Sequence, residues 1–270
     1  MTTIKAALVV QNCLVGQYDK NIDSSLQLID QAIKKNADFI VFPEMNLTGY
    51  VAGSKIKHIS KPVDLKIITL FSDICKKNNV TVLIGLAEKK DNSDIYASHL
   101  VFSPSGLIGT YRKIHTAPNE KKYFCAGDII PVFQSHGLIF GIQLCYDAHF
   151  PELSTAMATK NVDIIFLPHA SPRGTAQDKY DSWIRHLRAR AYDNGVFIAA
   201  CNQVGDNAGN LDFPGVSIFI GPDGNVISKS LSTDQTIHVI DIDKNKLDKI
   251  RSHKMRYFLP NRRADLFPQG

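Results

Sequence analysis

The sequence lacks long apolar runs, and its cysteines follow no pairing pattern. No segment of its 270 residues approaches the roughly 18 consecutive apolar residues of a membrane-spanning helix, and the apolar run in MTTIKAALVVQN is too short for a signal peptide. The cysteines are odd in number, widely spaced and without a CxxC pair, so a disulfide scaffold is disfavoured and a reducing compartment is favoured. We therefore expect a cytoplasmic protein without membrane contact. The five thiols are Cys13, Cys75, Cys125, Cys145 and Cys201.

Motifs for phosphate and nucleic-acid binding are also missing. The sequence has neither GxxxxGK nor GxGxxG, so nucleotide binding has no support. The net charge of +5 is mild, and its main concentration is the basic stretch from Lys244 to Arg263. The sequence shows no basic stripe regularly interleaved with aromatic residues and no zinc-finger spacing that would support nucleic-acid binding. A solvated helix and tail explain the basic stretch better than a surface for nucleic acid or another anionic partner.

What is present is a series of short apolar, β-branched runs. Helical patterns separate several of them, at residues 22–33, 63–77 and 177–193. Two pairs of runs are joined by turn sequences, SPSG at 103–106 and GPDG at 221–224, which predict hairpins. This order indicates an α/β fold with a mixed sheet covered by helices, and leaves open whether there is one sheet or two. The runs span residues 4–10, 38–42, 80–86, 96–102, 138–144, 163–168, 196–201, 215–220 and 236–242.

A carboxylate, an amine and a thiol each appear just as a predicted strand ends, the strand before the amine being LIGTYR at 107–112, the second strand of the SPSG hairpin. The three residues are Glu44 in FPEMNLTGY, Lys113 in YRKIHT and Cys145 in GIQLCYDAHFPE. Sites of α/β proteins tend to form at the carboxyl ends of strands. A thiol is mostly protonated at neutral pH, so Glu44 is a candidate base, while Lys113 and the Tyr146 N–H are candidate oxyanion donors. Each residue also has an ordinary interpretation, as a buried cysteine, a turn glutamate or a solvated lysine.

Other thiol and metal chemistry is less well supported. His115 and His149 lie near the candidate residues in sequence, but a papain-like signature around Cys145 is absent. A zinc site from Cys125, Cys145, His149 and His169 lacks the tight ligand spacing of such sites. We expect no metal.

The three strand-end motifs together resemble the nitrilase superfamily of carbon–nitrogen hydrolases. FPEMNLTGY, YRKIHT and GIQLCYDAHFPE resemble the family's glutamate, lysine and cysteine motifs, in the family's order, and the resemblance runs from KAALVVQN to RRADLF. It implies a four-layer α-β-β-α sandwich, with Glu44 as general base, Lys113 as stabiliser of the intermediate and Cys145 as nucleophile. It also implies Glu120 as a second glutamate that orients the lysine and the substrate.

The resemblance further implies how the chain is organised and assembled. We expect a single domain over residues 1–270, with a C-terminal tail from about residue 244 that packs on the body or on a partner subunit. Members commonly dimerise near the cysteine-bearing region, so we expect a homodimer or a larger homo-oligomer. No metal or organic cofactor is expected.

The residues around the cysteine limit the choice of substrate only in part. CYDAHFPE resembles the amidase and carbamoylase branches, which favours a small linear amide or an N-carbamoyl compound over a nitrile. Ammonia supply to a separate synthetase chain and an inactive scaffold are the alternatives; the intact Glu44, Lys113, Glu120 and Cys145 argue against a scaffold.

We interpret Arg188, Arg190 and Asp193 as structural ion pairs, and Arg173 as a candidate partner of a substrate carboxylate. The expected pocket residues are Tyr50, Tyr146, His149, Phe150, His169, Ser171 and Arg173, with Asn202 nearby.

Overall fold

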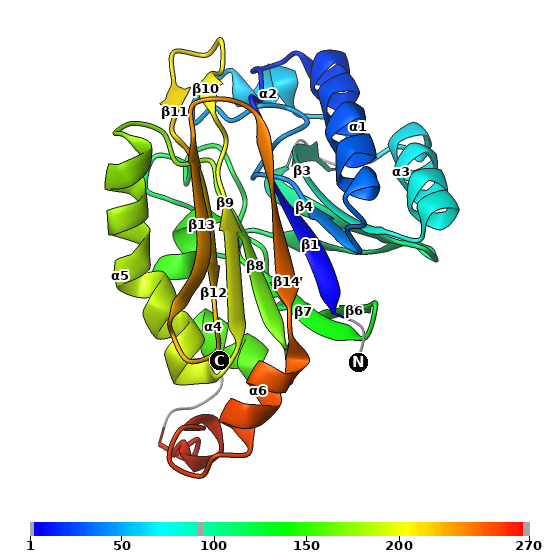
Figure 1. The fold of residues 1–270 in the computed structure, drawn as a ribbon. Helices are drawn as coiled ribbons and strands as arrows, with labels where there is room; N and C mark the ends of the chain where they lie inside the picture. Colours follow the sequence, from blue (N-terminus) through cyan, green and yellow to red (C-terminus); the bar gives the residue numbers. More distant parts are fainter. Residues whose placement is uncertain (1–2, 91–93, 267–270) are drawn as a thin grey trace.

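Two six-stranded mixed sheets lie face to face, with helices on both outer sides (Figure 1). The structure is a computed structural model that describes residues 3–90 and 94–266. The predicted α-β-β-α sandwich is confirmed, and the question of one sheet or two is answered in favour of two. Among the residues described, no helix combines the length and the apolar character needed to cross a membrane.

The first sheet has the order β14-β1-β2-β3-β4-β5. β1, β2 and β3 pair in parallel, whereas β3-β4-β5 pair antiparallel. β5 therefore runs in the same direction as β2, and the residues that follow these two strands leave the sheet at the same edge. The strands are β1 Ile4–Val10, β2 Phe39–Val41, β3 Thr81–Lys89, β4 Ile95–Ser103, β5 Gly106–Arg112 and β14 Thr236–Ile242.

The second sheet has the order β13-β12-β9-β8-β7-β6, and its central strands β7, β8 and β9 are parallel. A short separate hairpin of β10 Gly205–Asp206 and β11 Asp212–Phe213 follows β9. The strands of the second sheet are β6 Phe133–Ser135, β7 Leu138–Ile142, β8 Ile164–Pro168, β9 Phe197–Cys201, β12 Gly215–Ile220 and β13 Val226–Ser232.

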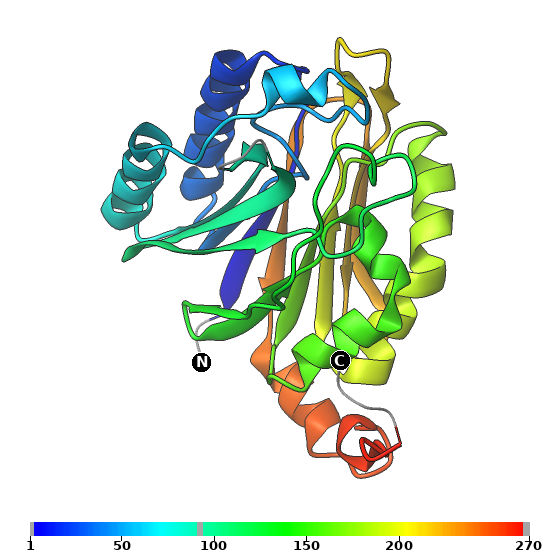
Figure 2. The same ribbon diagram turned by 180° about the vertical axis from the view of Figure 1, so that it is seen from behind.

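Helices α1 and α3 cover the outer face of the first sheet, and α4 and α5 cover that of the second (Figures 1 and 2). α5 is fixed at both ends: Thr175 and Asp178 exchange reciprocal hydrogen bonds at its start, and Gly195 ends it with φ 59°. The helices are α1 Tyr18–Lys34, α2 Ile56–Ile59, α3 Leu65–Asn78, α4 Pro151–Ala158, α5 Ala176–Asn194 and α6 Lys244–Arg251, with 3₁₀ turns η2 Cys145–His149 and η3 Leu259–Asn261.

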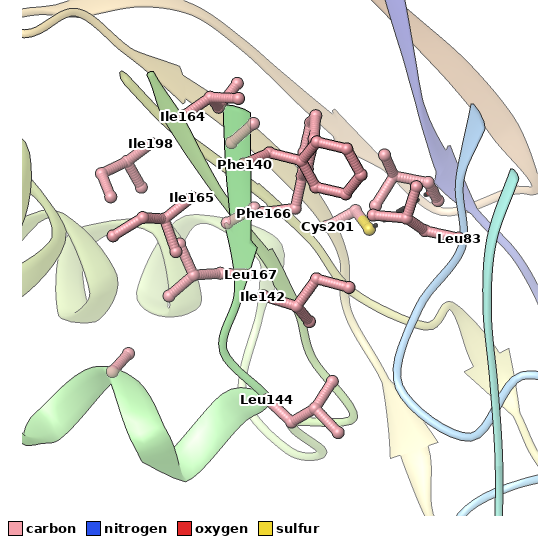
Figure 3. Packing of buried hydrophobic residues seen from close by; sticks show 14 of the residues in the cluster. Leu83, Phe140, Ile142, Leu144, Ile164, Ile165, Phe166, Leu167, Ile198 and Cys201 are labelled. Carbon is pink, nitrogen blue, oxygen red and sulfur yellow. Dashed lines mark hydrogen bonds between the residues drawn. The ribbon is translucent and has the colours of Figure 1, made fainter. Parts of the chain in front are cut away.

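Alternating side chains of the first sheet divide the core into layers. Along β1, Ala6 and Leu8 face the other sheet, while Ala7 and Val9 face the outer helices. Between the sheets, the Phe39 ring lies 5.4 Å from the ring of Phe140 and 5.8 Å from that of Phe166. In Figure 3, Phe140 and Cys201 of the second sheet point toward Leu83 of the first, whereas Ile165 and Ile198 point the opposite way. The sheets are thus joined by an apolar layer that fixes how their edges meet.

Most predicted elements are confirmed, including both hairpins, at β4–β5 and β12–β13. The sequence did not indicate β6, α4 or the β10–β11 hairpin, because strands of two or three residues and a helix of eight are too short to show a periodicity. α4 does begin with a local signal, because Pro151 occupies its first position, where the missing N–H costs nothing.

The basic C-terminal stretch begins with a helix, α6. Leu247 and Ile250 are buried, and Lys244 and Arg251 form ion pairs with Asp163 at 3.3 and 3.1 Å. Two of the positive charges in this stretch are therefore paired with a carboxylate of the same chain. A single domain with a tail that covers the body or a partner stays a prediction, and residues 267–270 of that tail lie outside the described part.

Candidate active site

Glu44 lies in the turn after β2 and is fully buried. Its carboxylate accepts hydrogen bonds from Lys113 Nζ at 2.8 Å and from the Ala170 N–H at 3.0 Å, and its main-chain oxygen accepts one from Gln203 Nε2 at 2.8 Å. Burial raises the pKa of Glu44 to about 7, with Glu120 adding to this effect and Lys113 opposing it. At neutral pH the carboxyl group is therefore suited both to accept and to release a proton.

Lys113 follows β5 and is also buried, at 1% exposure. Its Nζ lies between two carboxylates, 2.8 Å from Glu44 and 2.9 Å from Glu120. Burial lowers the pKa of Lys113, but Glu44 and Glu120 outweigh it and hold the pKa well above its ordinary value. The ammonium therefore remains charged and is fixed as a donor.

Glu120 completes this cluster from a turn after β5. One of its oxygens accepts a hydrogen bond from the Tyr50 hydroxyl at 2.9 Å, and the other accepts one from the Ala117 N–H at 2.8 Å. Because both oxygens are held, the carboxylate can position Lys113 without rotating. The orienting role that the resemblance implied for Glu120 stays a prediction.

Cys145 begins the 3₁₀ turn η2 just after β7, and its backbone has φ 45°. This left-handed conformation is uncommon for a residue with a side chain and is often found at functional sites. The residue is partly exposed. Burial and then Glu44 raise the pKa of the Cys145 thiol to about 12, against the opposing charge of Lys113. The thiol is thus protonated at neutral pH and needs a base beside it.

Asp147 holds the turn that carries Cys145. It is fully buried, and its two oxygens accept four hydrogen bonds: from the Leu144 N–H at 3.0 Å, the Tyr111 hydroxyl at 2.7 Å, the His115 N–H at 2.8 Å and His115 Nδ1 at 2.9 Å. This carboxylate links the start of the turn to the end of β5. Sequence reasoning noticed Asp147 only as part of the CYDAHFPE motif and missed its structural role.

Arginines of α5 support the same turn from the outer side. Arg190 donates hydrogen bonds to the main-chain oxygens of Ala148 at 3.1 Å and His149 at 3.4 Å, and Arg188 donates to that of Gly224 at 2.8 Å. The prediction of structural ion pairs was therefore wrong for these two side chains, whose hydrogen bonds go to carbonyl oxygens. Carbonyl groups left open at a turn are invisible in a sequence pattern.

Two of the expected pocket residues, His169 and Tyr50, are buried. His169 is buried, stacks on Trp183 with ring centroids 3.9 Å apart and shares a hydrogen bond with the Leu167 oxygen at 2.7 Å. Burial lowers the pKa of His169 to about 3, so this ring is neutral. Tyr50 is buried with its hydroxyl on Glu120. Roles for these residues in substrate binding stay predictions.

Three further expected residues cluster around η2. Tyr146 packs its ring against those of His149 and Phe150, at 5.6 and 5.5 Å between centroids. Phe150 also stacks on His115 at 3.7 Å, while His149 lies 4.6 Å from His186. His115 is thus committed to Phe150 and Asp147, which removes it from the Cys–His pairing considered from the sequence. Within the described residues, no group of histidine, cysteine and acidic side chains is arranged to hold a metal ion.

The loop after β8 carries Ser171 and Arg173. Asn202 fixes it, since its side chain accepts from the Ser171 N–H at 2.9 Å and donates to the Ser171 oxygen at 3.0 Å and to the Pro214 oxygen at 2.8 Å. Arg173 is exposed, with φ 70°. A lysine that sequence reasoning did not consider, Lys179, reaches this loop and donates to Ser171 Oγ at 2.9 Å.

Known proteins resemble this chain over most of its length. A nitrilase from Pyrococcus abyssi is 30% identical over 268 residues, which is 98% of this chain and 99% of that protein. An (R)-stereoselective amidase from a Pseudomonas species is 29% identical over 233 residues, covering 86% of this chain and 81% of the amidase. The crystal structure of a carbon-nitrogen hydrolase from Helicobacter pylori superposes with a TM-score of 0.86 at 26% identity, covering 98% of this chain and 97% of that one.

The family assignment follows from the match along nearly the whole chain. The sequence model of the carbon-nitrogen hydrolase family matches residues 5–252, a range that includes all four residues of the buried cluster. The chain belongs to the carbon-nitrogen hydrolases of the nitrilase superfamily.

Proposed function

We propose that this protein hydrolyses the C–N bond of a small linear amide or N-carbamoyl compound through a thioester on Cys145. The observation that carries the proposal is the pairing of a protonated thiol with a buried carboxyl group, Glu44, whose pKa is about 7. Lys113, held between Glu44 and Glu120, supplies a fixed positive charge at the same place. These are the parts that acyl transfer requires: a nucleophile, a base and an oxyanion donor.

In the first half-reaction, Glu44 accepts the thiol proton as the sulfur of Cys145 attacks the carbonyl carbon. The carbonyl oxygen becomes an oxyanion, which Lys113 and the Tyr146 N–H stabilise. The C–N bond then breaks, and Glu44 returns its proton to the departing nitrogen. The products of this half-reaction are ammonia or an amine and an acyl group bound to sulfur.

In the second half-reaction, Glu44 removes a proton from water while the water oxygen attacks the thioester carbon. The C–S bond breaks, the acid leaves, and the proton on Glu44 returns to the sulfur. One carboxyl group serves both halves because each half needs a proton acceptor and then a proton donor at the same place. Glu120 orients Lys113 in both, and the expected pocket residues contact the rest of the substrate.

The test is ammonia release from a panel of amides, N-carbamoyl acids and nitriles, with Cys145→Ala as the control. We expect release from amides or carbamoyl compounds with wild type and none with the variant. Release that survives Cys145→Ala would refute the mechanism, and release from nitriles alone would replace amide hydrolysis by nitrile hydrolysis. Equal inertness of both proteins on every substrate would favour a scaffold.

We also propose a cytoplasmic homodimer. All five cysteines are free thiols, which suits a reducing compartment. Apolar side chains lie exposed on and after the outer helices, among them Tyr192, Met255 and Phe258. Light scattering after size-exclusion chromatography tests the assembly: a mass near twice the chain's 30.0 kDa is expected, and a monomer would contradict it.

A further inference from the structure

Lys179 lies in the first turn of α5, and its side chain reaches back to the loop after β8. Its Nζ donates hydrogen bonds to Ser171 Oγ at 2.9 Å and to the Pro172 oxygen at 3.0 Å. Both acceptors are uncharged. The side chain is half-buried, so its long stem and its ammonium are partly removed from solvent.

The positive charge on Lys179 has no negative partner in the described residues. No ion pair forms on its Nζ there, and the neighbouring Asp178 carboxylate is engaged with the N–H and hydroxyl of Thr175. Burial lowers the pKa of Lys179, whereas Cys145 and Asp178 act in the opposite direction. A cation in the first turn also opposes the helix dipole. Neither the helix nor a salt bridge explains why a lysine stands here.

The position of Lys179 relative to the nucleophile offers an explanation. Ser171, which Lys179 contacts, directly follows Ala170, whose N–H donates a hydrogen bond to the Glu44 carboxylate at 3.0 Å. Asn202 holds Ser171 by both its N–H and its oxygen, so the loop that Lys179 contacts is fixed in place. The ammonium is therefore held by a loop that also contacts Glu44, the base of the proposed mechanism.

We propose that Lys179 binds a carboxylate at the far end of the substrate, so that the enzyme selects amides or N-carbamoyl derivatives of carboxylic acids over neutral and cationic amides. This inference rests on the proposed function and names its substrate class. Lys113 does not serve the purpose, because two carboxylates already surround it. Arg173, the candidate expected from the sequence, is exposed, whereas Lys179 is half-buried and contacts Ser171.

A kinetic series of equal chain length tests the charge preference. Glutaramate carries a terminal carboxylate, pentanamide carries no charge, and 5-aminopentanamide carries an ammonium. For wild type we expect the highest kcat/KM with glutaramate. Lys179→Met raises KM for glutaramate roughly 10- to 100-fold with little change in kcat, and it leaves pentanamide unaffected, because a contact distant from the reacting bond acts equally on ground and transition states.

The controls separate this contact from a general loss of charge or structure. Lys229 lies over the ring of Tyr180, next to Lys179 on α5, at 3.7 Å, and Lys229→Met should leave the preference unchanged. Lys179→Arg should restore part of it. An equal loss on glutaramate and pentanamide would overturn the inference, as would a preference that survives Lys179→Met but disappears in Arg173→Met.

A second measurement does not depend on turnover. Iodoacetate and iodoacetamide alkylate a thiol in the same way but differ in charge. Peptide mass mapping gives the rate at each cysteine, with the partly exposed Cys125 as internal reference. We expect Lys179→Met to lower the iodoacetate-to-iodoacetamide ratio several-fold at Cys145 and not at Cys125. An unchanged ratio at Cys145 would refute the role of Lys179, whether or not the protein hydrolyses any amide. Absence of amide hydrolysis alone would count against the proposed function and not against the role of Lys179.

Discussion

Replacing Asp147 tests whether its carboxylate positions the nucleophile. Two hydrogen bonds reach each of its oxygens: the Tyr111 hydroxyl and the Leu144 N–H on Oδ2, and the N–H and Nδ1 of His115 on Oδ1. An asparagine offers one oxygen and one NH₂, so in either orientation its NH₂ faces a main-chain N–H that cannot reverse. A rotating hydroxyl or a histidine tautomer can adapt, but that N–H loses its acceptor.

The burial of the two N–H groups decides which orientation Asp147→Asn adopts. The Leu144 N–H is buried, whereas the His115 N–H lies at a partly buried contact that water can reach. The NH₂ group should therefore face His115, where the cost is near the lower end of about 1–3 kcal/mol for an unsatisfied group. Leu144 keeps its acceptor, so Cys145 keeps its place and activity falls less than about tenfold.

Asp147→Ala removes all four acceptor positions at once. Breaking a buried charged network costs about 3–5 kcal/mol, and releasing the Leu144 peptide lets Cys145 shift, where about 1 Å of misplacement lowers the rate roughly 100-fold. Urea unfolding, ammonia release and the alkylation rate of Cys145 measure these effects. Asp73, exposed on α3, provides the matched control Asp73→Ala. An Asp147→Ala protein as stable and as active as wild type would refute this assignment. So would an Asp147→Asn protein whose stability and activity are as low as those of Asp147→Ala.

Three further predictions address the base, the lysine and the packing under the nucleophile. Because Glu44 must be deprotonated to accept the thiol proton, kcat/KM should rise with pH around a midpoint of about 7; a profile flat from pH 5 to 9 would contradict this. Lys113→Met leaves two buried carboxylates without their cation, so ammonia release should vanish and unfolding free energy should fall by about 3–5 kcal/mol; urea unfolding with retained stability would argue against the buried pairing. Gly141→Ala places a Cβ 2.6 Å from Met157 Sδ and should cost about 1–3 kcal/mol by thermal unfolding, whereas Gly53→Ala, with open space around it, should stay within about 0.5 kcal/mol; equal effects would count against close packing there.

The sequence predicts those parts of the fold and the site that depend on local pattern. Glu44, Lys113 and Cys145 were found because each appears just as a predicted strand ends, and parallel β2 and β5 do bring the first two to one edge. Glu120 follows no strand, so only family resemblance indicated it. The choice of two sheets over one depends on contacts such as Phe39 with Phe140, which no local periodicity encodes.

The supporting residues were missed for a related reason. Ala170 acts through a main-chain N–H, which any residue type can supply, and its partner Glu44 lies 126 residues away. Asp147 acts through four donors on three other elements or turns, although its own residue type was visible in the motif. Lys179 resembles any lysine at the start of a helix until the loop it contacts is known. Such roles arise only when the two sheets are assembled.

The pKa values of the two reacting groups constrain how the thiol is activated. Burial raises the pKa of the Cys145 thiol to about 12 and that of Glu44 to about 7, so the thiol is the weaker acid of the two. A preformed thiolate is therefore a minor species, and the proton moves most favourably as the S–C bond forms and the negative charge passes to the carbonyl oxygen. Lys113 lies beside the carboxylate that receives the proton, so it stabilises the charge on Glu44 before the transfer and the oxyanion after it. The burial that makes the thiol a weak acid thus also makes the carboxyl group a strong enough base.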